Sequence, residues 1–185
     1  MMLGQVNFNL ISTDNNAGTP FYFNTDIKGL RVGDIVVVWS RGKRQLGTFL
    51  GYSDKEYNAK SKIERKALGS EVRDFWNKVE ENLKEKPLTL SNSLFKYYKT
   101  HFKGNLNTRK EEAEKKLTRN VILTSITHSK SINNKKLHTF FYGTQMIVVK
   151  NNEIVNIKAV NKNSKIKFFK NKEKYKQLNE HFELN

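Results

Sequence analysis

The first part of the chain carries the hydrophobic patterns of β-strands. Residues 5–11 alternate apolar and polar side chains, which predicts a strand with one buried and one exposed face. A polar loop follows, and the aromatic residues within 21–25 predict a second strand. The opening of the chain is therefore expected to be β-structure.

The strongest β signal is a hairpin that follows these two strands. The β-branched and aromatic run Ile35–Trp39 is long enough for one buried strand, and Gln45–Tyr52 returns as its partner. Gly47 and Gly51 in the return strand predict a bulge or tight bend, as at the corner of a small barrel. Between the strands, Ser40–Arg44 holds one glycine and three cations, which is typical of an exposed hairpin tip.

The middle of the chain changes to the three- and four-residue apolar spacing of helices. We expect helices at 70–85, with Ser70 as the cap, at 89–102, and at 108–117, where a capping box marks the start. Each of these helices carries lysines on its polar side, so the whole region is basic.

A charged segment joins the hairpin to the first predicted helix. Residues 55–66 are rich in lysine and poor in apolar side chains, so they are interpreted as a solvated connector. Ser53 and Glu56 have the spacing of a capping box, which is a weak sign of a short helix at the start of this segment.

The last third of the chain returns to β-patterns and ends in an amphipathic helix. A turn is expected at 131–136, and the apolar stripe of Tyr175, Leu178 and Phe182 predicts the closing helix. Strands are expected at 121–127, 137–142, 145–149, 153–160 and 166–169.

These elements predict an α+β fold. We expect a small SH3-like or OB-like β-barrel with a basic helical insertion, further antiparallel strands and a C-terminal helix. The predicted parts are the barrel portion 1–52, the helical insertion 53–118, and the hairpins with the closing helix in 119–185. The lack of a Pro- or Gly-rich linker favours one compact body.

The net charge of the chain indicates which class of molecule it binds. The 185 residues carry a net charge of +16, and residues 1–40, with two basic and three acidic side chains, contribute −1, so residues 41–185 carry +17. This asymmetry favours a polyanionic partner, although a Lys- and Asn-rich composition also arises from AT-rich codon usage and solubilises a surface. Cysteine is absent and no apolar run is long enough to cross a membrane, so a cytoplasmic protein without a membrane partner is expected.

Catalytic signals are weak. The four histidines lack zinc-site spacing, and the chain has no phosphate loop, dinucleotide fingerprint or nucleophile elbow. Asp34, Glu56 and Lys60 can be arranged into a nuclease pattern, but Asp34 after Gly33 is better explained as a turn residue. We therefore predict no catalytic residue, no metal ligand and no cofactor, with a small metal-dependent nuclease as the third alternative.

Cations and aromatic rings remain as the candidate site. Arg41, Lys43 and Arg44 at the hairpin tip are predicted to contact phosphates, and Trp39 to stack on a base. The competing interpretation is that Trp39 and Phe49 both face the barrel core, as apolar strand runs usually do. A secondary set of cations lies on the second predicted helix: Lys96, Lys99 and Lys103. Tyr97 and Tyr98 of the same helix are expected in the core.

Several short motifs recur together in a known family. They are the aromatic stretch 21–23, the Val-Gly-Asp turn within 30–34, the valine run 36–38, the basic turn 41–44 and the return strand 46–49, with Tyr97-Tyr98 further on. In this order they resemble the N-terminal 3′-end DNA-binding region of the primosomal replication-restart helicase, over about residues 5–102. Similar hairpins occur in small barrels of phage and mobile-element proteins, and the helicase motor is absent. The resemblance implies a small DNA-binding barrel.

The predicted function is a non-catalytic nucleic-acid-binding accessory protein of a phage or mobile element. Its partner would be DNA or RNA, with single strands favoured because exposed rings stack on unpaired bases. The alternative is a protein-binding inhibitor or modulator of a host or defence nucleoprotein complex.

Overall fold

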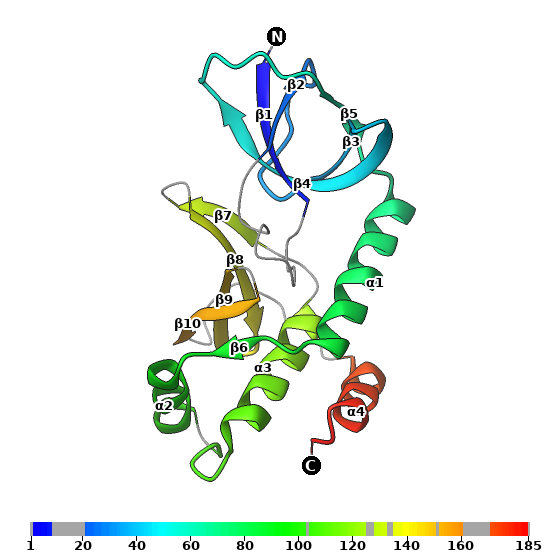
Figure 1. Cartoon of the computed structure of the whole chain (residues 1–185). Coiled ribbons are helices and arrows are strands. Elements are labelled where there is room, and N and C mark those ends of the chain that lie inside the picture. Colours follow the sequence, from blue (N-terminus) through cyan, green and yellow to red (C-terminus); the bar gives the residue numbers. More distant parts are fainter. Residues whose placement is uncertain are drawn as a thin grey trace. The chain divides into compact units, whose positions relative to one another are not determined.

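A computed structural model of the chain describes residues 2–8, 21–102, 104–124, 128–132, 135–150, 152–160 and 171–184, with backbone alone for 128–138. The chain divides into two compact units. The first unit comprises Met1–Val79 and Ser129–Leu137, and the second comprises Glu80–His128 and His138–Asn185. Two β-sheets and four α-helices lie within the described ranges, which confirms the predicted α+β class (Figure 1).

Five strands of the first unit close into a barrel in the order β1-β2-β5-β3-β4 (Figure 1). All neighbouring pairs are antiparallel except β2–β5, which is parallel and pairs Asn24 with Lys62. The strands are β1 (Met2–Asn7), β2 (Phe21–Thr25), β3 (Ile35–Ser40), β4 (Lys43–Ser53) and β5 (Lys62–Lys66). The more specific likeness to SH3 or OB folds stays a prediction.

The barrel interior is apolar and tightly packed. Its cluster of buried side chains is made of Val6, Phe23, Leu30, Val36, Val38, Phe49 and Ile63. The register of β1 on β4 shifts around Leu50, and Gly51 has a φ of +135°, so the bulge predicted for this strand is present. At Gly47 the chain passes so close to Val6 that a β-carbon would overlap its side chain. Both glycines are thus required by the local backbone path.

Strand β5 corrects two predictions. Residues 62–66 were expected to belong to a solvated connector, but they form the strand that joins β2 to β3. One apolar side chain, Ile63, points into the core while its charged neighbours face outward, so the strand is nearly invisible in the hydrophobic pattern. The short helix expected near Ser53 is also absent: β4 continues to that residue, and its Oγ accepts a hydrogen bond from the Lys55 amide.

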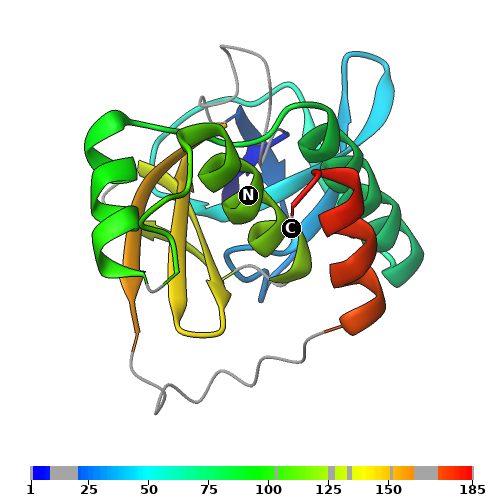
Figure 2. The same cartoon turned by 90° about the horizontal axis from the view of Figure 1, so that it is seen from below.

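The other sheet has the strand order β6-β10-β9-β8-β7, and three helices accompany it. Its strands are β6 (Thr89–Leu90), β7 (His128–Ile132), β8 (Lys135–Tyr142), β9 (Gln145–Lys150) and β10 (Glu153–Ala159). Strands β6, β9 and β10 belong wholly to the second unit, whereas most of β7 and the start of β8 belong to the first. The helices are α2 (Asn92–His101), α3 (Lys110–Thr124) and α4 (Lys172–His181). Helix α3 lies between the sheet and α4, while α2 lies beside β10 (Figures 1 and 2).

Helix α3 corrects the prediction of a strand at 121–127. The helix does not end near Leu117 but continues to Thr124, because Ala113, Leu117 and Val121 lie four residues apart and are all buried. Burial of this stripe overrides the local β-preference of the β-branched residues. Residues 125–127 and the predicted strand at 166–169 lie outside the described part of the chain.

The other predicted elements of this unit are found with shifted bounds. The helix expected at 89–102 begins at Asn92, because residues 89–90 pair with β10 and Ser91 caps the helix by accepting from the Leu94 amide. Of the turn expected at 131–136, residues 131–132 belong to β7 and residues 135–136 to β8, while residues 133–134 lie outside the described part of the chain. The predicted strands corresponding to β8, β9 and β10 and the closing helix α4 are confirmed.

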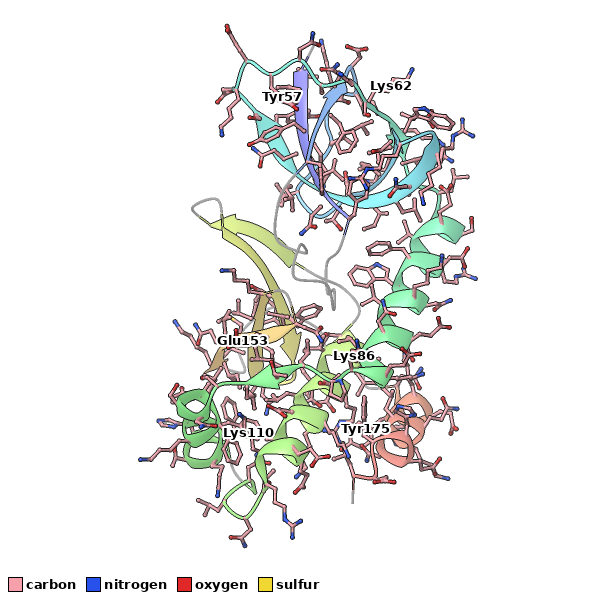
Figure 3. The ribbon with its side chains drawn as sticks, viewed as in Figure 1. Tyr57, Lys62, Lys86, Lys110, Glu153 and Tyr175 are labelled. Atoms are coloured by element: carbon pink, nitrogen blue, oxygen red, sulfur yellow. The ribbon has the colours of Figure 1, made fainter. Side chains whose placement is uncertain are left out.

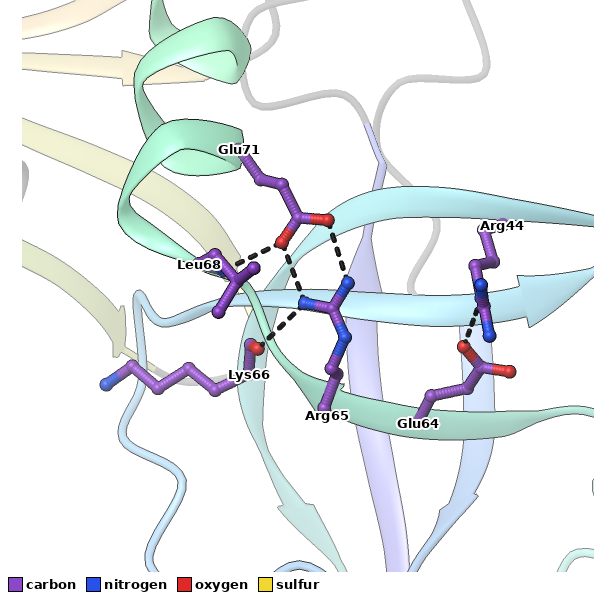
Figure 4. Close-up of polar contacts among 6 residues, drawn as sticks. All are labelled: Arg44, Glu64, Arg65, Lys66, Leu68 and Glu71. Carbon is purple, nitrogen blue, oxygen red and sulfur yellow. Dashed lines mark hydrogen bonds and ion pairs between the residues drawn. The ribbon is translucent and has the colours of Figure 1, made fainter.

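Helix α1 (Gly69–Glu85) confirms the first predicted helix but not its cap. The carboxylate of Glu71, rather than the Ser70 hydroxyl, accepts a hydrogen bond from the Leu68 amide at 2.7 Å. Two further bonds of 2.7 and 2.9 Å join Glu71 to the guanidinium of Arg65 at the end of β5 (Figure 4). A charged fork therefore ties the first turn of α1 to the barrel strand that precedes it.

Candidate nucleic-acid interface

The hairpin tip is a two-residue turn with an unusual conformation. Ser40 pairs with Lys43, and the intervening Arg41 and Gly42 have φ angles of 52° and 75°. Positive φ at both positions defines a type I′ turn, which matches the twist of the flanking strands. Glycine, asparagine and aspartate suit the first position, whereas an arginine there costs about 1–2 kcal/mol. The predicted hairpin tip is confirmed, and it holds a cation in a strained backbone position.

Trp39 and Phe49 occupy opposite environments. Phe49 is 1% exposed and belongs to the barrel core, whereas Trp39 is 45% exposed. The interpretation that both rings are buried is therefore correct for Phe49 and wrong for Trp39. Side chains alternate along β3, and with Val36 and Val38 inside the barrel, Trp39 must lie on the outer face.

Two cations flank the exposed indole on neighbouring strands. Trp39 is paired with Arg44 on β4 and with Lys62 on β5, and directly opposed residues share one face of a sheet. Both cations are exposed. Lys62 was missed from the sequence because it was assigned to the connector, and its signal appears only once β5 is known to pair with β3.

Arg44 is the one tip cation with an ion-pair partner among the described residues. Its Nε lies 2.7 Å from a Glu64 carboxylate oxygen (Figure 4). An exposed pair of this kind contributes little stability. Arg41 and Lys43 are exposed and make no ion pair within the described ranges. The tip thus presents more positive than negative charge.

The lysines of the secondary set belong to the second unit. Lys96 is exposed on α2, and the Lys99 ammonium lies 5.6 Å from the centre of the Phe95 ring. Lys103 lies outside the described residues. Among the predicted binding residues, the structure brings Trp39, Arg41, Lys43 and Arg44 together on one hairpin, whereas Lys96 and Lys99 belong to the other unit.

The two tyrosines of α2 differ in burial. Tyr98 is buried, as expected, and its hydroxyl donates to Asn105 Oδ1 at 3.3 Å. Burial raises the pKa of Tyr98 to about 12, so the hydroxyl keeps its proton. Tyr97 is half-buried and stacks on His101 at a centroid distance of 3.9 Å.

The acidic residues near the hairpin are engaged in structure. Asp34 accepts a hydrogen bond from the Arg31 amide at 2.9 Å and pairs with Lys66 at 2.7 Å, so its interpretation as a turn residue is confirmed. In the parts of the chain that the structure describes, no three His, Cys, Asp or Glu side chains gather closely enough to hold a metal ion. None of the described helices has the length and apolar character needed to cross a membrane.

Comparison with known proteins gives one match. A family model described as YorE matches residues 88–181, which include α2, α3, α4 and the strands β6 to β10 but no barrel strand. A search of the curated proteins found no match, and neither did a search of the solved structures. The resemblance of residues 5–102 to the replication-restart helicase stays a prediction. Because the match spans just over half of the 185 residues, the chain belongs to the YorE family.

Proposed function

We propose that this protein is a non-catalytic, phage-associated accessory protein that binds nucleic acid through the β3–β4 hairpin. The observation that carries the proposal is an exposed indole, Trp39, between the cations Arg44 and Lys62 on one outer face of the barrel. Cations attract phosphates and flat rings stack on bases, which is the chemistry of nucleic-acid binding without catalysis.

Two further observations support the proposal. Arg41 keeps a cation at a turn position that favours smaller residues, and strained positions of this kind concentrate at functional sites. The YorE family match supports the phage association. DNA and RNA are both candidate ligands, because phosphate and base contacts are available from either.

The direct test is equilibrium binding of labelled DNA and RNA, single- and double-stranded, between about 50 and 200 mM salt. The variant R41A/K43A/R44A removes the three tip cations. With about 0.7 counterions released per phosphate contact on a single strand, it should bind about a hundredfold more weakly at 0.1 M salt, with a salt slope smaller by about 2. The probes should remain intact in Mg²⁺.

A charge-matched control separates the hairpin from general electrostatics. The variant K86A/K158A/K172A removes three exposed lysines of the second unit and should retain most of the affinity. Equal losses in both variants, or no binding by the unmodified protein, would refute the proposed interface.

A second candidate is a protein-binding module that acts on a host or defence nucleoprotein complex. It is favoured by Leu106, which is 69% exposed at the turn between α2 and α3, inside the family-matched segment. In that case L106A would weaken binding to the complex, and free oligonucleotides would not compete.

A further inference from the structure

A second group of aromatic rings lies on the barrel, and the proposed function does not yet use it. The ring centroids of Tyr22 and Tyr57 are 5.7 Å apart, and Tyr57 is 60% exposed. The ammonium of Lys55 lies 5.7 Å from the centre of the Tyr22 ring. This aromatic pair with its cation repeats the chemistry of the Trp39 site.

The pairing of the strands places the two aromatic sites on one continuous face. Trp39 is opposite Lys62, and Lys62 is opposite Asn24, two residues from Tyr22 along β2. Phe23 is in the core, so Tyr22 lies on the outer face. Trp39 and Tyr22 are therefore separated by two strand spacings, about 10 Å, and by two residues along the strand, about 7 Å.

The segment that carries Tyr57 is fixed to the same part of the barrel. The Asn24 side chain donates to the Ala59 carbonyl at 2.6 Å, and the Asn24 amide donates to the Ser61 carbonyl at 2.9 Å. Figure 3 labels Tyr57 and Lys62, which both lie at the upper end of the barrel. The tyrosine pair thus has a defined position relative to Lys62.

We infer that a single-stranded nucleic acid runs across the outer face of β4, β3, β5 and β2, with two stacking stations. Trp39 is the first station and the Tyr22–Tyr57 pair is the second. Arg44 and Lys62 flank the first station, and Lys55 lies at the second, so cations recur along the whole track. This inference rests on the proposed function and adds that the bound nucleic acid is single-stranded and which strands of the barrel it crosses.

A single strand fits these features better than a duplex. In a duplex the flat faces of the bases are stacked on one another and only base edges are exposed in the grooves. Side-chain rings can stack on bases only where the bases are unpaired, and sequence-tolerant single-strand binders combine such rings with a basic path. The track is expected to need about 4 nucleotides or more, the lower limit for small barrels that bind single strands.

The two-station track predicts a dependence on oligonucleotide length. W39A should weaken binding of both short and long probes, because the first station lies beside the tip cations. Y22L/Y57L should weaken binding of an oligothymidylate or oligouridylate of about 12 nucleotides by about tenfold, and leave a probe of about 3 nucleotides unchanged. Y22F/Y57F keeps both rings and should bind both probes as the unmodified protein does. Whichever probe binds more tightly, the DNA or the RNA oligonucleotide, identifies the class of the natural ligand.

The outcomes distinguish this inference from the proposed function. If the unmodified protein binds no oligonucleotide, the proposed function fails. If R41A/K43A/R44A loses affinity but Y22L/Y57L binds the longer probe normally, or if duplex binds more tightly than single strand, only the track is overturned. Y57L alone and K62E change exposed side chains and serve for the case in which Y22L/Y57L does not fold. Each should weaken binding of the longer probe, and normal binding by both would overturn the track.

Discussion

The hairpin arginines of the first unit and Arg119 of the second lie in opposite environments. In the barrel, Arg41 projects from a turn into solvent, and Arg44 is exposed beside Trp39. In the second unit, Arg119 of α3 is buried and makes three hydrogen bonds to the side-chain oxygens of Asn120 and Asn179. Its guanidinium also lies 4.5 Å from the centre of the Tyr175 ring, which Figure 3 labels on α4.

This difference separates cations that hold the fold from cations available to a partner. A buried guanidinium with its donors engaged fixes the packing of α3 on α4, whereas an exposed guanidinium can still donate hydrogen bonds to a phosphate. Sequence alone gives both kinds the same charge. This difference in burial is why the proposed binding role falls on the barrel, although the family match lies mainly on the second unit.

The largest expected loss of stability comes from truncating a buried side chain in the core of one unit at a time. F49A in the barrel and L117A in α3 each remove a fully buried side chain, and each should cost about 3–5 kcal/mol of unfolding free energy. Hydrogen exchange should show lost protection in β1–β5 for the first variant and in the α3 region for the second. If either variant exposes both units equally, the cores are not independent.

The two classes of arginine give the next largest effect. R119M leaves the oxygens of two asparagines without their donor and should lower stability by about 2–3 kcal/mol, with unchanged nucleic-acid affinity while the protein is folded. R44M should cost under about 1 kcal/mol of stability and lower affinity about fivefold at 0.1 M salt. Chemical denaturation and oligonucleotide binding measure the two quantities, and a reversed pattern would refute the division of roles.

Features that depend on neighbouring residues were predicted from the sequence, whereas features that depend on residues far apart in the chain were missed. The hairpin was predicted because its apolar run, glycines and tip cations are adjacent in the chain. Strand β5 was not, because Ile63 is its single buried residue and its partners on β3 lie about 25 positions away. The outward orientation of Trp39 was also hidden, since the run Ile35–Trp39 contains no polar residue to mark the outer face.

Helix α3 shows the opposite failure. Its last turns contain Val121 and Ile122, whose local preference is for strands, and the prediction followed that preference. Contact of the helix with the sheet and with α4 buries Leu117 and Val121 on one side, which local propensity does not register. The buried Arg119 was missed for the same reason, because a charged residue is expected at the surface until its helix is known to be covered.

Acid should weaken the fork that holds α1 to β5. The hydrogen bond from Arg65, together with that from the Leu68 amide, lowers the pKa of Glu71 from 4.5 to about 2. A carboxyl whose pKa is depressed in the folded state stabilises it above pH 4.5, and this contribution is lost as the pH falls towards 2. E71Q should therefore be less stable than the unmodified protein near pH 7, and the difference should vanish at low pH.

Urea unfolding of both proteins at several pH values measures this difference. E71A serves as the control, because glutamine still accepts from the Leu68 amide and alanine does not. A stability gap between E71Q and the unmodified protein that persists unchanged down to pH 2 would show that the charge of Glu71 is not the source of its effect.

The smallest change tests the tip itself. Asparagine tolerates the left-handed conformation that Arg41 adopts at a φ of 52°, so R41N should raise stability by up to about 1 kcal/mol. The same variant removes one phosphate contact and should lower nucleic-acid affinity about fivefold at 0.1 M salt. K43N is the matched control: it loses the same charge at a strand residue and should lower affinity without raising the melting temperature. A gain in stability with loss of binding means that the barrel retains a strained arginine for its partner, whereas unchanged binding by R41N would leave the strain without a function.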